Sequence, residues 1–475
     1  MTTVLVSGNF NVVHAGHLRL LRFAKSCGDK LIVAVQSDRL AGAAAVVSEN
    51  FRLEGLQSNR LVDETFIFDE PIEDLISRLK PEIVVKGKEH EKGLNKELEA
   101  IEKYGGRLIF SSGDVVFSST DLLNNEINGF TQERRIIDEY LKRHDIDRDG
   151  LHQLIQSCSK LNVCVIGDLI IDEYVACEAL GMSQEDPTLV VAPVSSKRFI
   201  GGAGIVAAHA SSLGAQVKFI SVVGGDEPHI FSQKEFEKYE VKTHLYVDQD
   251  RPTTVKQRFR AGNKTLLRVS RLSQSSISVQ LQNKIKECVL SQIGDIDLLV
   301  FSDFNYGCLP QSLVDDIIQE CSASGTMVVA DSQASSQISD VARFKNIELI
   351  TPTEREARLS LRDNSNGLVV LANSLSSIAN TKHVLLKLGS EGVLIYTRME
   401  QGDSWITDQL PSLNANPTDV AGAGDCMLIC TSMALALGAD IWSAALIGSA
   451  AAAKQIGKLG NLPLTQSELH DSLTF

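Results

Sequence analysis

The stretch D-V-A-G-A-G-D at residues 419–425 decides how the larger part of this chain folds. Gly422, Ala423 and Gly424 carry little or no side chain, so their backbone N–H groups can approach an anion closely. The apolar run that follows is compatible with a helix, whose dipole would place its positive end at the same point. Asp425 closes the loop as a candidate general base. The stretch therefore predicts an anion hole beside a base, although a short Gly/Ala loop alone is also found in ordinary tight turns.

Length, charge and cysteine content restrict the class of protein. The 475 residues predict two or three domains, and 43% apolar with 22% charged residues is typical of a soluble globular protein. The formal net charge of −14 argues against nucleic-acid partners and against an anionic membrane surface. The sequence has no signal-peptide pattern at its N-terminus and no apolar run of the ~20 residues that span a bilayer. Nine cysteines without CxxC pairs fit reduced thiols, so we expect a cytoplasmic protein.

A second chemical signal is the segment G-N-F-N-V-V-H-A-G-H at residues 8–17. It follows a short buried strand at Val4–Val6 and precedes an amphipathic helix and a strand at Lys30–Val35, which together predict a β-α-β unit. His14 and His17 lie where the helix begins, so they could hydrogen-bond a triphosphate in its charged transition state. The alternatives for such a pair are a metal site or two surface histidines.

Residues 1–128 resemble the cytidylyltransferase-like nucleotidyltransferases. The segment at 8–17 is similar to the family signature G-x-F-[DN]-x-x-H-x-G-H, and two later pieces recur in order, V-V-K-G at 84–87 and S-S-T at 118–120. The resemblance implies a Rossmann-like domain in which the two histidines stabilise the transferred nucleotidyl group. The residues that it implies for binding the nucleotide and its phosphates are Gly8, Phe10, Asn11, Lys86, Ser119 and Thr120.

Two departures concern the substrate site of this domain. Asn11 stands where many family members carry Asp. The stretch L-A-G-A-A-A-V-V at 40–47 lacks the Lys and Arg-Pro that sugar-phosphate nucleotidyltransferases usually have, which leaves Arg52 as the basic candidate. The sequence therefore leaves open whether this domain is active or only binds a nucleotide.

The charge-rich residues 129–158 predict a helical linker. Within it, the segment D-I-D-R-D-G at 145–150 imitates the start of an EF-hand loop. Gln156 occupies the twelfth position of that loop, where calcium binding requires a bidentate carboxylate. We therefore expect helix capping around a turn and no calcium site.

From Leu161 a second α/β pattern begins. Buried strands are predicted at 163–167, 217–224, 297–303, 327–331, 347–352 and 384–389, and helices at 205–213, 279–293, 313–324 and 374–380. Their alternation predicts a parallel, doubly wound sheet. Short strand-like stretches at 188–193 and 195–200 predict a small β lid. Acidic residues at several strand ends suit a Mg-nucleotide site at the carboxyl edge of the sheet, where ligands bind in open α/β sheets.

Residues 159–475 resemble the ribokinase/PfkB carbohydrate kinases. The loop at 419–425 is the specific element, supported by G-D-L-I-I-D at 167–172, G-G-A-G at 201–204 and G-S-E-G at 389–392. By this resemblance Asp425 takes the proton from a sugar hydroxyl while the loop amides hold the γ-phosphate of ATP. A β-lid sheet in these kinases often pairs subunits, so a homodimer is expected.

The same resemblance assigns the other residues of the kinase site. Glu356, at the end of T-E-R-E, would act through Mg²⁺ and its waters. Thr353 replaces the Asn of the family's N-x-x-E, and Ile205 stands near where an Asn often reads a sugar hydroxyl, so the sugar stays open. The residues implied for the sugar are Asp172, Gly201, Gly202 and Arg258, and those implied for ATP are Gly422, Ala423, Gly424, Lys387, Ser390 and Gly392.

A nucleotidyltransferase half followed by a kinase half resembles the bifunctional heptose-phosphate kinase/ADP-heptose synthases, with the two halves in the opposite order. The resemblance implies phosphorylation of a heptose-like sugar or sugar phosphate, usually at C1. Transfer of a nucleotidyl group from ATP or CTP to the sugar 1-phosphate would then give an NDP-sugar and pyrophosphate. Two alternatives stay open: a kinase with a degenerate, nucleotide-binding N-terminal domain, and a non-catalytic scaffold that senses nucleotide or sugar.

Overall fold

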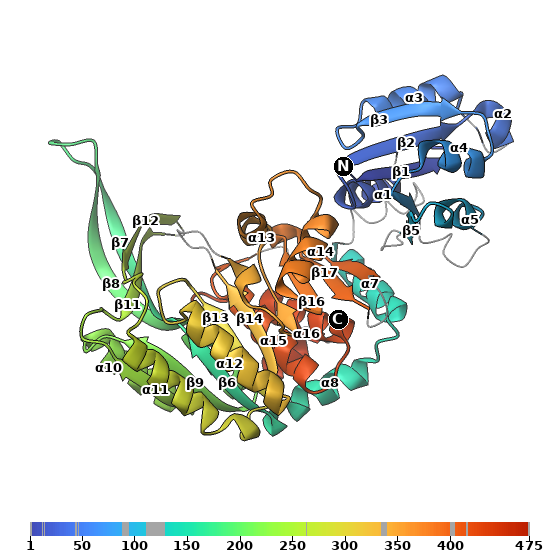
Figure 1. Cartoon of the computed structure of the whole chain (residues 1–475). Coiled ribbons are helices and arrows are strands. Elements are labelled where there is room, and N and C mark those ends of the chain that lie inside the picture. Colours follow the sequence, from blue (N-terminus) through green and yellow to red (C-terminus); the bar gives the residue numbers. More distant parts are fainter. Residues whose placement is uncertain are drawn as a thin grey trace. The chain divides into compact units, whose positions relative to one another are not determined.

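The computed structural model describes residues 2–11, 13, 15–42, 45, 47–87, 95–110, 129–262, 264–333, 340–399, 404–414 and 417–473. The chain divides into two compact units, one built mainly from residues 1–142 and the other mainly from residues 143–475 (Figure 1).

The first unit is a five-stranded parallel sheet in the order β3-β2-β1-β4-β5. Val4, Leu5 and Val6 of the central strand β1 are buried, as their apolar run predicted. The strand order reverses between β1 and β4, which confirms the Rossmann-like expectation. Open α/β sheets generally bind their ligands at such a reversal. The strands are β1 Thr3–Gly8, β2 Lys30–Gln36, β3 Glu64–Phe68, β4 Ile83–Lys86 and β5 Arg107–Phe110, and the helices α1 Ala15–Ser26, α2 Asp38–Ala41, α3 Glu49–Gln57, α4 Ile72–Leu79 and α5 Glu97–Glu102.

Two helices occupy the charge-rich part of the chain, α7 (Gly129–Arg143) and α8 (Arg148–Ser157). Asp147 caps α8, because its Oδ2 accepts a hydrogen bond of 2.9 Å from the backbone N–H of Gly150. The expectation of helix capping in the EF-hand-like segment is confirmed. The described residues contain no group of three or more His, Cys, Asp or Glu side chains that could hold a metal ion.

The second unit contains a nine-stranded sheet in the order β10-β9-β6-β13-β14-β15-β16-β17-β18. The strands from β10 to β16 pair in parallel, whereas β17 runs antiparallel to β16. The connection between β16 and β17 is too short for the helix that a parallel crossover needs, so the sheet is mixed at this edge. The strands are β6 Asn162–Gly167, β9 Gln216–Val223, β10 Lys242–Val247, β13 Leu298–Asp303, β14 Met327–Ser332, β15 Leu349–Ile350, β16 His383–Lys387, β17 Val393–Arg398 and β18 Trp405–Leu410.

Helices lie between and after the strands of this unit. They are α9 Ala203–Ser212, α10 Glu227–Lys238, α11 Val279–Leu290, α12 Gln311–Ser324, α13 Glu354–Leu361, α14 Leu368–Ala379, α15 Ala423–Ala436, α16 Ile441–Gln455 and α17 Gln466–Leu473. Helix α15 is apolar on nearly all sides and is buried from Asp425 to Leu435 against α16 and α9. The loop at 419–425 is therefore anchored directly in the core.

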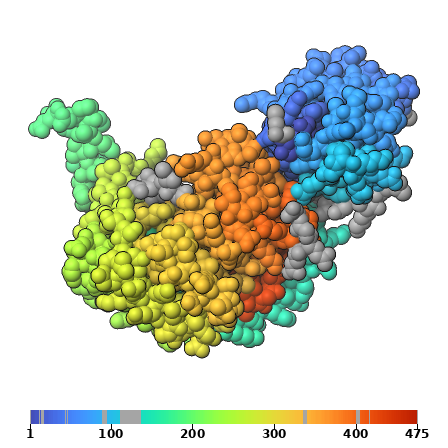
Figure 2. Space-filling model, viewed as in Figure 1, coloured from blue at the N-terminus to red at the C-terminus, as the bar shows by residue number. Residues whose placement is uncertain are grey.

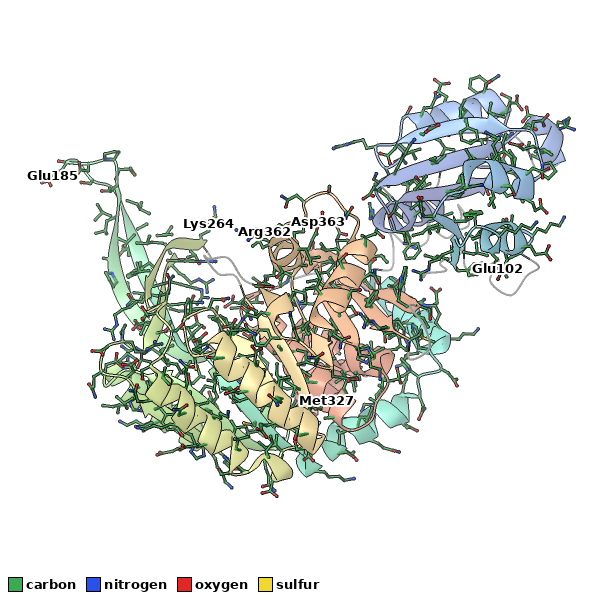
Figure 3. The ribbon with its side chains drawn as sticks, in the orientation of Figure 1. Glu102, Glu185, Lys264, Met327, Arg362 and Asp363 are labelled. Carbon is green, nitrogen blue, oxygen red and sulfur yellow. The ribbon has the colours of Figure 1, made fainter. Side chains whose placement is uncertain are left out.

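A second, four-stranded sheet forms the lid, in the order β12-β11-β7-β8. Its strands are β7 Leu169–Met182, β8 Leu189–Gly202, β11 Thr254–Ala261 and β12 Lys264–Arg271. The sequence predicted two short stretches where β8 is one continuous strand of 14 residues. The β7–β8 hairpin extends away from the rest of the unit, with Glu185 at its tip (Figures 2 and 3). The lid is thus longer than its polar interruptions suggested.

The nine cysteines are free, and all but Cys288 are buried. None of the helices in the described part of the chain combines the length and apolar character that crossing a bilayer requires.

Candidate active site

One cavity of about 820 Å³ in the second unit gathers most of the residues predicted for the kinase half. Its wall is drawn from the lid strands β7 and β11, from the loop after β14, from the β16–β17 connection and from the start of α15. The predicted residues in its lining are Asp172, Gly202, Arg258, Glu356, Lys387, Ser390, Gly392, Gly422, Ala423, Gly424 and Asp425. These predicted residues lie up to 253 positions apart in the sequence and face one space.

Two glycines of the anion loop have close neighbours. Gly422 caps α15 with φ 76°, a left-handed conformation that favours glycine, and a Cβ there would overlap Asn461 Oδ1. A Cβ on Gly424 would lie 3.1 Å from Lys387 Nζ. The loop amides therefore line the cavity at the positive end of α15, next to a lysine ammonium.

Asp419, the first residue of the motif, holds the loop in place and is not itself in the cavity lining. Its Oδ1 accepts a hydrogen bond of 3.1 Å from Ala421 N. Its Oδ2 accepts from Tyr174 Oη at 2.7 Å and from Gly460 N at 3.2 Å. The carboxylate thereby joins the loop to the lid strand β7 and to the segment after α16.

Asp425 is 5% exposed and lies in the first turn of α15. Gln333 Nε2 donates a hydrogen bond of 2.8 Å to its Oδ1. Burial is the main cause that raises the pKa of Asp425 to about 7, and the nearby charge of Asp331 raises it further, against the opposing effect of Lys387. The carboxylate is consequently suited to exchange a proton near neutral pH.

Lys387 lies beside the anion loop in an acidic environment. Its Nζ is 2.9 Å from Asp331 Oδ2. Burial opposes the charge on Lys387, but the carboxylates of Asp331 and Glu356 outweigh it, and the pKa of the ammonium is raised. The lysine is therefore a permanent cation that a phosphate entering the loop would meet.

Glu356 and Thr353 cap helix α13 in a reciprocal way. Thr353 N donates to Glu356 Oε2 at 2.7 Å, and Glu356 N donates to Thr353 Oγ1 at 3.2 Å, which is a capping box. Thr353, which stands in place of the family's Asn, thus keeps Glu356 fixed at the cavity wall. A carboxylate oxygen is the donor type that Mg²⁺ takes, usually with several retained waters, so the residue fits this ion.

Asp172 is fixed on the lid side of the cavity. Its Oδ1 forms an ion pair with Arg258, and its Oδ2 accepts a hydrogen bond of 2.9 Å from Asn461 Nδ2. A Cβ on Gly201 would overlap Asp172 Oδ2, and Gly202 adopts φ 59°, so this turn requires glycine at both positions. The glycine pair therefore provides the room in which the carboxylate sits.

Lys256 is held over two aromatic rings at the same wall. Its Nζ lies 5.1 Å from the ring centroid of Phe304 and 5.2 Å from that of Tyr306. The loop that carries these rings is fixed by the buried Asp168, which accepts from Phe304 N at 2.9 Å and from Tyr306 N at 3.2 Å. Within the described part of the chain, Lys256 has no carboxylate in salt-bridge contact. It contributes an uncompensated positive charge to the cavity.

In the first unit, the turn after β1 places several predicted residues together. Phe10 has φ 49°, its ring centroid lies 5.0 Å from that of His17, and its Cε2 would be 3.3 Å from a Cβ on Gly8. Asn11 Oδ1 accepts a hydrogen bond of 3.3 Å from Val47 N. The turn is thus packed against the first helix and tied to the 40–47 stretch.

Arg52 has a different role from the one suggested by its place in the sequence. It is 1% exposed and donates to Asn9 O at 2.6 Å, to Val47 O at 2.7 Å and to Asp38 Oδ1 at 2.6 Å. The interpretation of Arg52 as a basic residue left to bind substrate is wrong, because its guanidinium is occupied by the backbone of the two loops. It positions the turn at Asn9 instead.

Lys86 at the end of β4 pairs with the largely buried Glu97, with 2.8 Å between Nζ and Oε1. Any phosphate that binds Lys86 must therefore share it with this carboxylate. The predicted residues His14, Ser119 and Thr120 lie outside the described residues.

Among the polar lining residues that were not predicted as site residues are Lys256, Gln333 and Asn461. Lys256 stands two residues before Arg258 on β11, and the two-residue period of a strand would have placed both on one face. Gln333 and Asn461 lie in loops, and no local pattern points to the cavity.

Comparisons with known proteins agree with both halves. Residues 160–466 match the family described as pfkB family carbohydrate kinase, and residues 5–112 match the family described as cytidylyltransferase-like. The bifunctional protein HldE of Desulfatibacillum aliphaticivorans is 29% identical over 334 residues, which is 69% of this chain and 66% of that protein. HldE of Helicobacter hepaticus is 30% identical over 313 residues, 65% of this chain and 62% of that protein. The chain thus matches slightly less than two thirds of these relatives' own length.

Solved structures confirm the fold of the second unit. Arabidopsis thaliana ribokinase, complexed with ribose and ATP, has a TM-score of 0.51 at 17% identity and covers 66% of this chain and 99% of its own. Phosphofructokinase-2 of Escherichia coli, with substrates and products, has a TM-score of 0.53 at 16% identity and covers 66% of this chain and 98% of its own. At these identities the likeness concerns the fold alone.

Proposed function

The chain belongs to the pfkB family of carbohydrate kinases, and on that premise we propose that its second unit transfers a phosphoryl group from ATP to a sugar hydroxyl. The observation that carries the proposal is Asp425, a buried carboxylate with a pKa raised to about 7, in the same cavity as the amides of the 422–424 loop. A general base works best when its pKa lies near the operating pH. A transferring phosphoryl group is stabilised by preorganised hydrogen-bond donors around its oxygens.

The transfer follows from the placement of these groups. Asp425 takes the proton of the sugar hydroxyl, whose oxygen then forms a bond to the γ-phosphorus while the bond from that phosphorus to the bridging oxygen breaks. ADP leaves with the electron pair. The loop amides and Lys387 stabilise the negative charge on the transferring group, and Ser390 and Gly392 border the nucleotide. Mg²⁺, when bound, neutralises phosphate charge, and Glu356 would hold it through water.

The acceptor that fits this wall carries an anionic group of its own. Lys256 has no carboxylate partner among the described residues, and Arg258 lies on the same strand with Asp172 as its partner. A neutral sugar would leave the charge of Lys256 unused in a partly closed cavity. We therefore propose that the acceptor is a heptose-like sugar phosphate, and that the kinase adds the new phosphate at C1. The phosphate that the acceptor already carries is to be tested first at C7.

We propose nucleotidyl transfer for the first unit. We also propose that the nucleotidyltransferase domain ends at residue 128 and that the helical linker ends at residue 158. A phosphate oxygen of the sugar 1-phosphate would attack the α-phosphorus of ATP or CTP and displace pyrophosphate. His14 and His17 would stabilise the charge on the transferred group, and the other phosphate contacts would come from Lys86, Ser119 and Thr120. If the sugar 1-phosphate still carries the phosphate that the acceptor had before the kinase step, another protein must remove that phosphate before nucleotidyl transfer.

A second candidate is a sugar kinase whose first unit only binds a nucleotide. The observation that favours it is Arg52: its guanidinium is used by backbone carbonyls, so the 40–47 stretch brings no basic side chain of its own to a sugar phosphate. Isothermal calorimetry with ATP and CTP, together with pyrophosphate release in the presence of sugar 1-phosphates, separates the two candidates.

Product analysis tests the proposed function. The intact protein is incubated with Mg-ATP and a panel of hexoses, heptoses and their terminal phosphates, and ADP and sugar products are identified by mass spectrometry. We expect ADP formation that depends on a sugar phosphate, and NDP-sugar plus pyrophosphate when a sugar 1-phosphate is supplied. Tight ATP binding without any sugar product across the panel would instead support a nucleotide- or sugar-sensing scaffold.

The pH dependence of the kinase step follows from Asp425. Its pKa is raised to about 7, and the base must be unprotonated to act, so kcat/KM should rise by about tenfold per pH unit below pH 7 and level off above it. The measurement is the initial rate from pH 5 to 9 at saturating Mg-ATP. Calorimetry of Mg-ATP over the same range separates the ionisation of ATP from that of the enzyme. A flat profile between pH 5 and 7 contradicts Asp425 as the base.

We place the protein in the cytoplasm, where ATP is available and its nine thiols remain reduced.

We also propose a homodimer formed by the β7–β8 hairpin. Beyond Ala176, β7 pairs with β8 but not with β11, and such a two-stranded ribbon is marginally stable alone in water. Leu180 and Met182 on this ribbon are 60% and 63% exposed, so a second copy of the same ribbon is the self-complementary surface that would cover them.

The double substitution Leu180→Glu and Met182→Glu should convert the dimer to a monomer, because it places four carboxylates in the proposed interface. Light scattering after size exclusion gives the mass of each form. Val279→Glu, which changes an exposed apolar residue on α11, is the matched control and should leave the dimer intact. A wild-type protein that is monomeric at micromolar concentration contradicts the proposal.

A further inference from the structure

Asn461 lies in the segment between α16 and α17 and lines the kinase cavity. It is 4% exposed. The preceding residue, Gly460, is held from two sides, since its N–H donates to Asp419 Oδ2 at 3.2 Å and its carbonyl accepts from Gln455 Nε2 at 3.2 Å. The asparagine is therefore presented from a fixed backbone.

The orientation of its amide is set by chemistry. Asn461 lies 2.9 Å from Asp172 Oδ2, and an ionised carboxylate only accepts hydrogen bonds. The NH₂ group must therefore face Asp172, and the carbonyl oxygen Oδ1 must face the other way.

Oδ1 of Asn461 is buried and has no hydrogen-bond donor among the described residues. A buried carbonyl without a donor is destabilising, because it has lost its hydrogen bonds to water. The atom lies against the α-carbon of Gly422, where any side chain would overlap it, and the NH₂ group lies 3.3 Å from the position of a Cβ on Gly201. Glycines on both sides thus let the amide pack between the Asp172 carboxylate and the anion loop.

We propose that Asn461 is a specificity-determining residue that accepts a hydrogen bond from one hydroxyl of the acceptor sugar. This proposal rests on the proposed kinase function. It makes Asn461 a second residue, beside Asp172, that recognises the sugar. The hydroxyl would lie between the Asp172 carboxylate and the loop that holds the γ-phosphate. Asn461 also positions Asp172 through its NH₂ group. A sugar that lacks this hydroxyl leaves Oδ1 unpaired and is rejected.

The test compares a heptose 7-phosphate with its monodeoxy analogues on the wild type and on Asn461→Leu, which keeps the volume but removes both polar atoms. The wild type should discriminate against one deoxy analogue by about 100-fold in kcat/KM, since a site built to bind a hydroxyl rejects the analogue that lacks it. Asn461→Leu should lose that discrimination to within about threefold while it keeps the discrimination against the other analogues. The KM for ATP should stay within about twofold.

Asn162→Leu is the matched control. Its amide also lies against a carboxylate, Asp297, but at the start of β6, away from the cavity lining, and it should leave all ratios unchanged. If Asn461→Leu lowers kcat/KM by the same factor for every analogue, Asn461 is only a structural residue and the proposal is overturned. Asn461→Ala provides a second variant with the same expected pattern if the leucine variant does not fold.

The failure of this proposal differs from the failure of the kinase assignment. A wild type that phosphorylates no sugar counts against the kinase. Calorimetric titration of the deoxy series in the presence of a non-hydrolysable ATP analogue still measures the coupling between Asn461 and one hydroxyl. Affinities that fall equally for all analogues in Asn461→Leu overturn the assignment of the hydroxyl.

Discussion

Asp425→Asn is expected to lower kcat of the kinase reaction by about 10³-fold or more, because an amide cannot take the proton of the sugar hydroxyl. The substitution is nearly isosteric. The hydrogen bond of 2.8 Å from Gln333 Nε2 can still be accepted by the Asn carbonyl, so the start of α15 should keep its geometry. The measurement is the rate of ADP formation at saturating sugar phosphate and Mg-ATP.

Two controls assign this loss to the proton transfer. Calorimetry should give an ATP affinity for Asp425→Asn within about threefold of the wild type, and its residual rate should no longer rise toward pH 7. Asp316→Asn alters a surface carboxylate paired with Lys286 on α11 and should leave the rate unchanged, because exposed ion pairs contribute little. Wild-type turnover by Asp425→Asn would refute Asp425 as the base.

His17→Ala is expected to lower nucleotidyl transfer by about 100-fold, since removal of one donor from a charged transition state typically costs at least this factor. His17 is packed on Phe10, with ring centroids 5.0 Å apart, and this contact holds the imidazole at the turn after β1. The measurement is pyrophosphate release from ATP and from CTP with a sugar 1-phosphate as acceptor. The donor that supports turnover is identified in the same assay.

The kinase reaction provides the internal control for this variant. The two reactions use different units of the chain, so His17→Ala should leave ADP formation within about twofold of the wild type. His17→Gln keeps an N–H donor and should recover part of the lost transfer rate. Pyrophosphate release that His17→Ala leaves unchanged would remove His17 from the mechanism, and a wild type without any release would favour the binding-only first unit.

Much of the fold could be predicted from local patterns. Apolar runs that end in glycine or aspartate, as at Gly167 and Asp303, are typical of buried parallel strands, and both lie where the sequence placed them. The antiparallel direction of β17 could not be predicted, because an apolar run carries no information on the direction of its strand. The length of β8 was also underestimated, since an exposed lid strand tolerates the polar residues that usually mark a loop.

The site divides in the same way between local and distant contacts. Asp425 and Gly422 could be singled out because the loop and the following helix form one continuous motif. Asn461 could not, because its partner Asp172 lies 289 positions away in the chain. A contact of this kind depends on the assembled fold and leaves no spacing signal in the sequence.

Arg52 illustrates the limit of reading charge from sequence. A basic residue next to a phosphate-binding turn is compatible with a ligand contact or with hydrogen bonds to the backbone. The three short bonds from its guanidinium to Asn9, Val47 and Asp38 decide for the second. Thr353 is the opposite case. It departs from the family's motif, but its side chain still caps helix α13 by accepting a hydrogen bond from Glu356 N.

The most direct test of the central claim is the position of the phosphate on the product of the kinase reaction. The claim is that Asp425 activates the hydroxyl at C1, so that the product, after any second phosphate is removed, is the substrate of the first unit. Phosphorus-31 NMR of the product from a heptose 7-phosphate should show a new signal coupled to the anomeric proton. A phosphate on any other carbon, or no new signal, would contradict the account, because the first unit would then have no sugar 1-phosphate to activate.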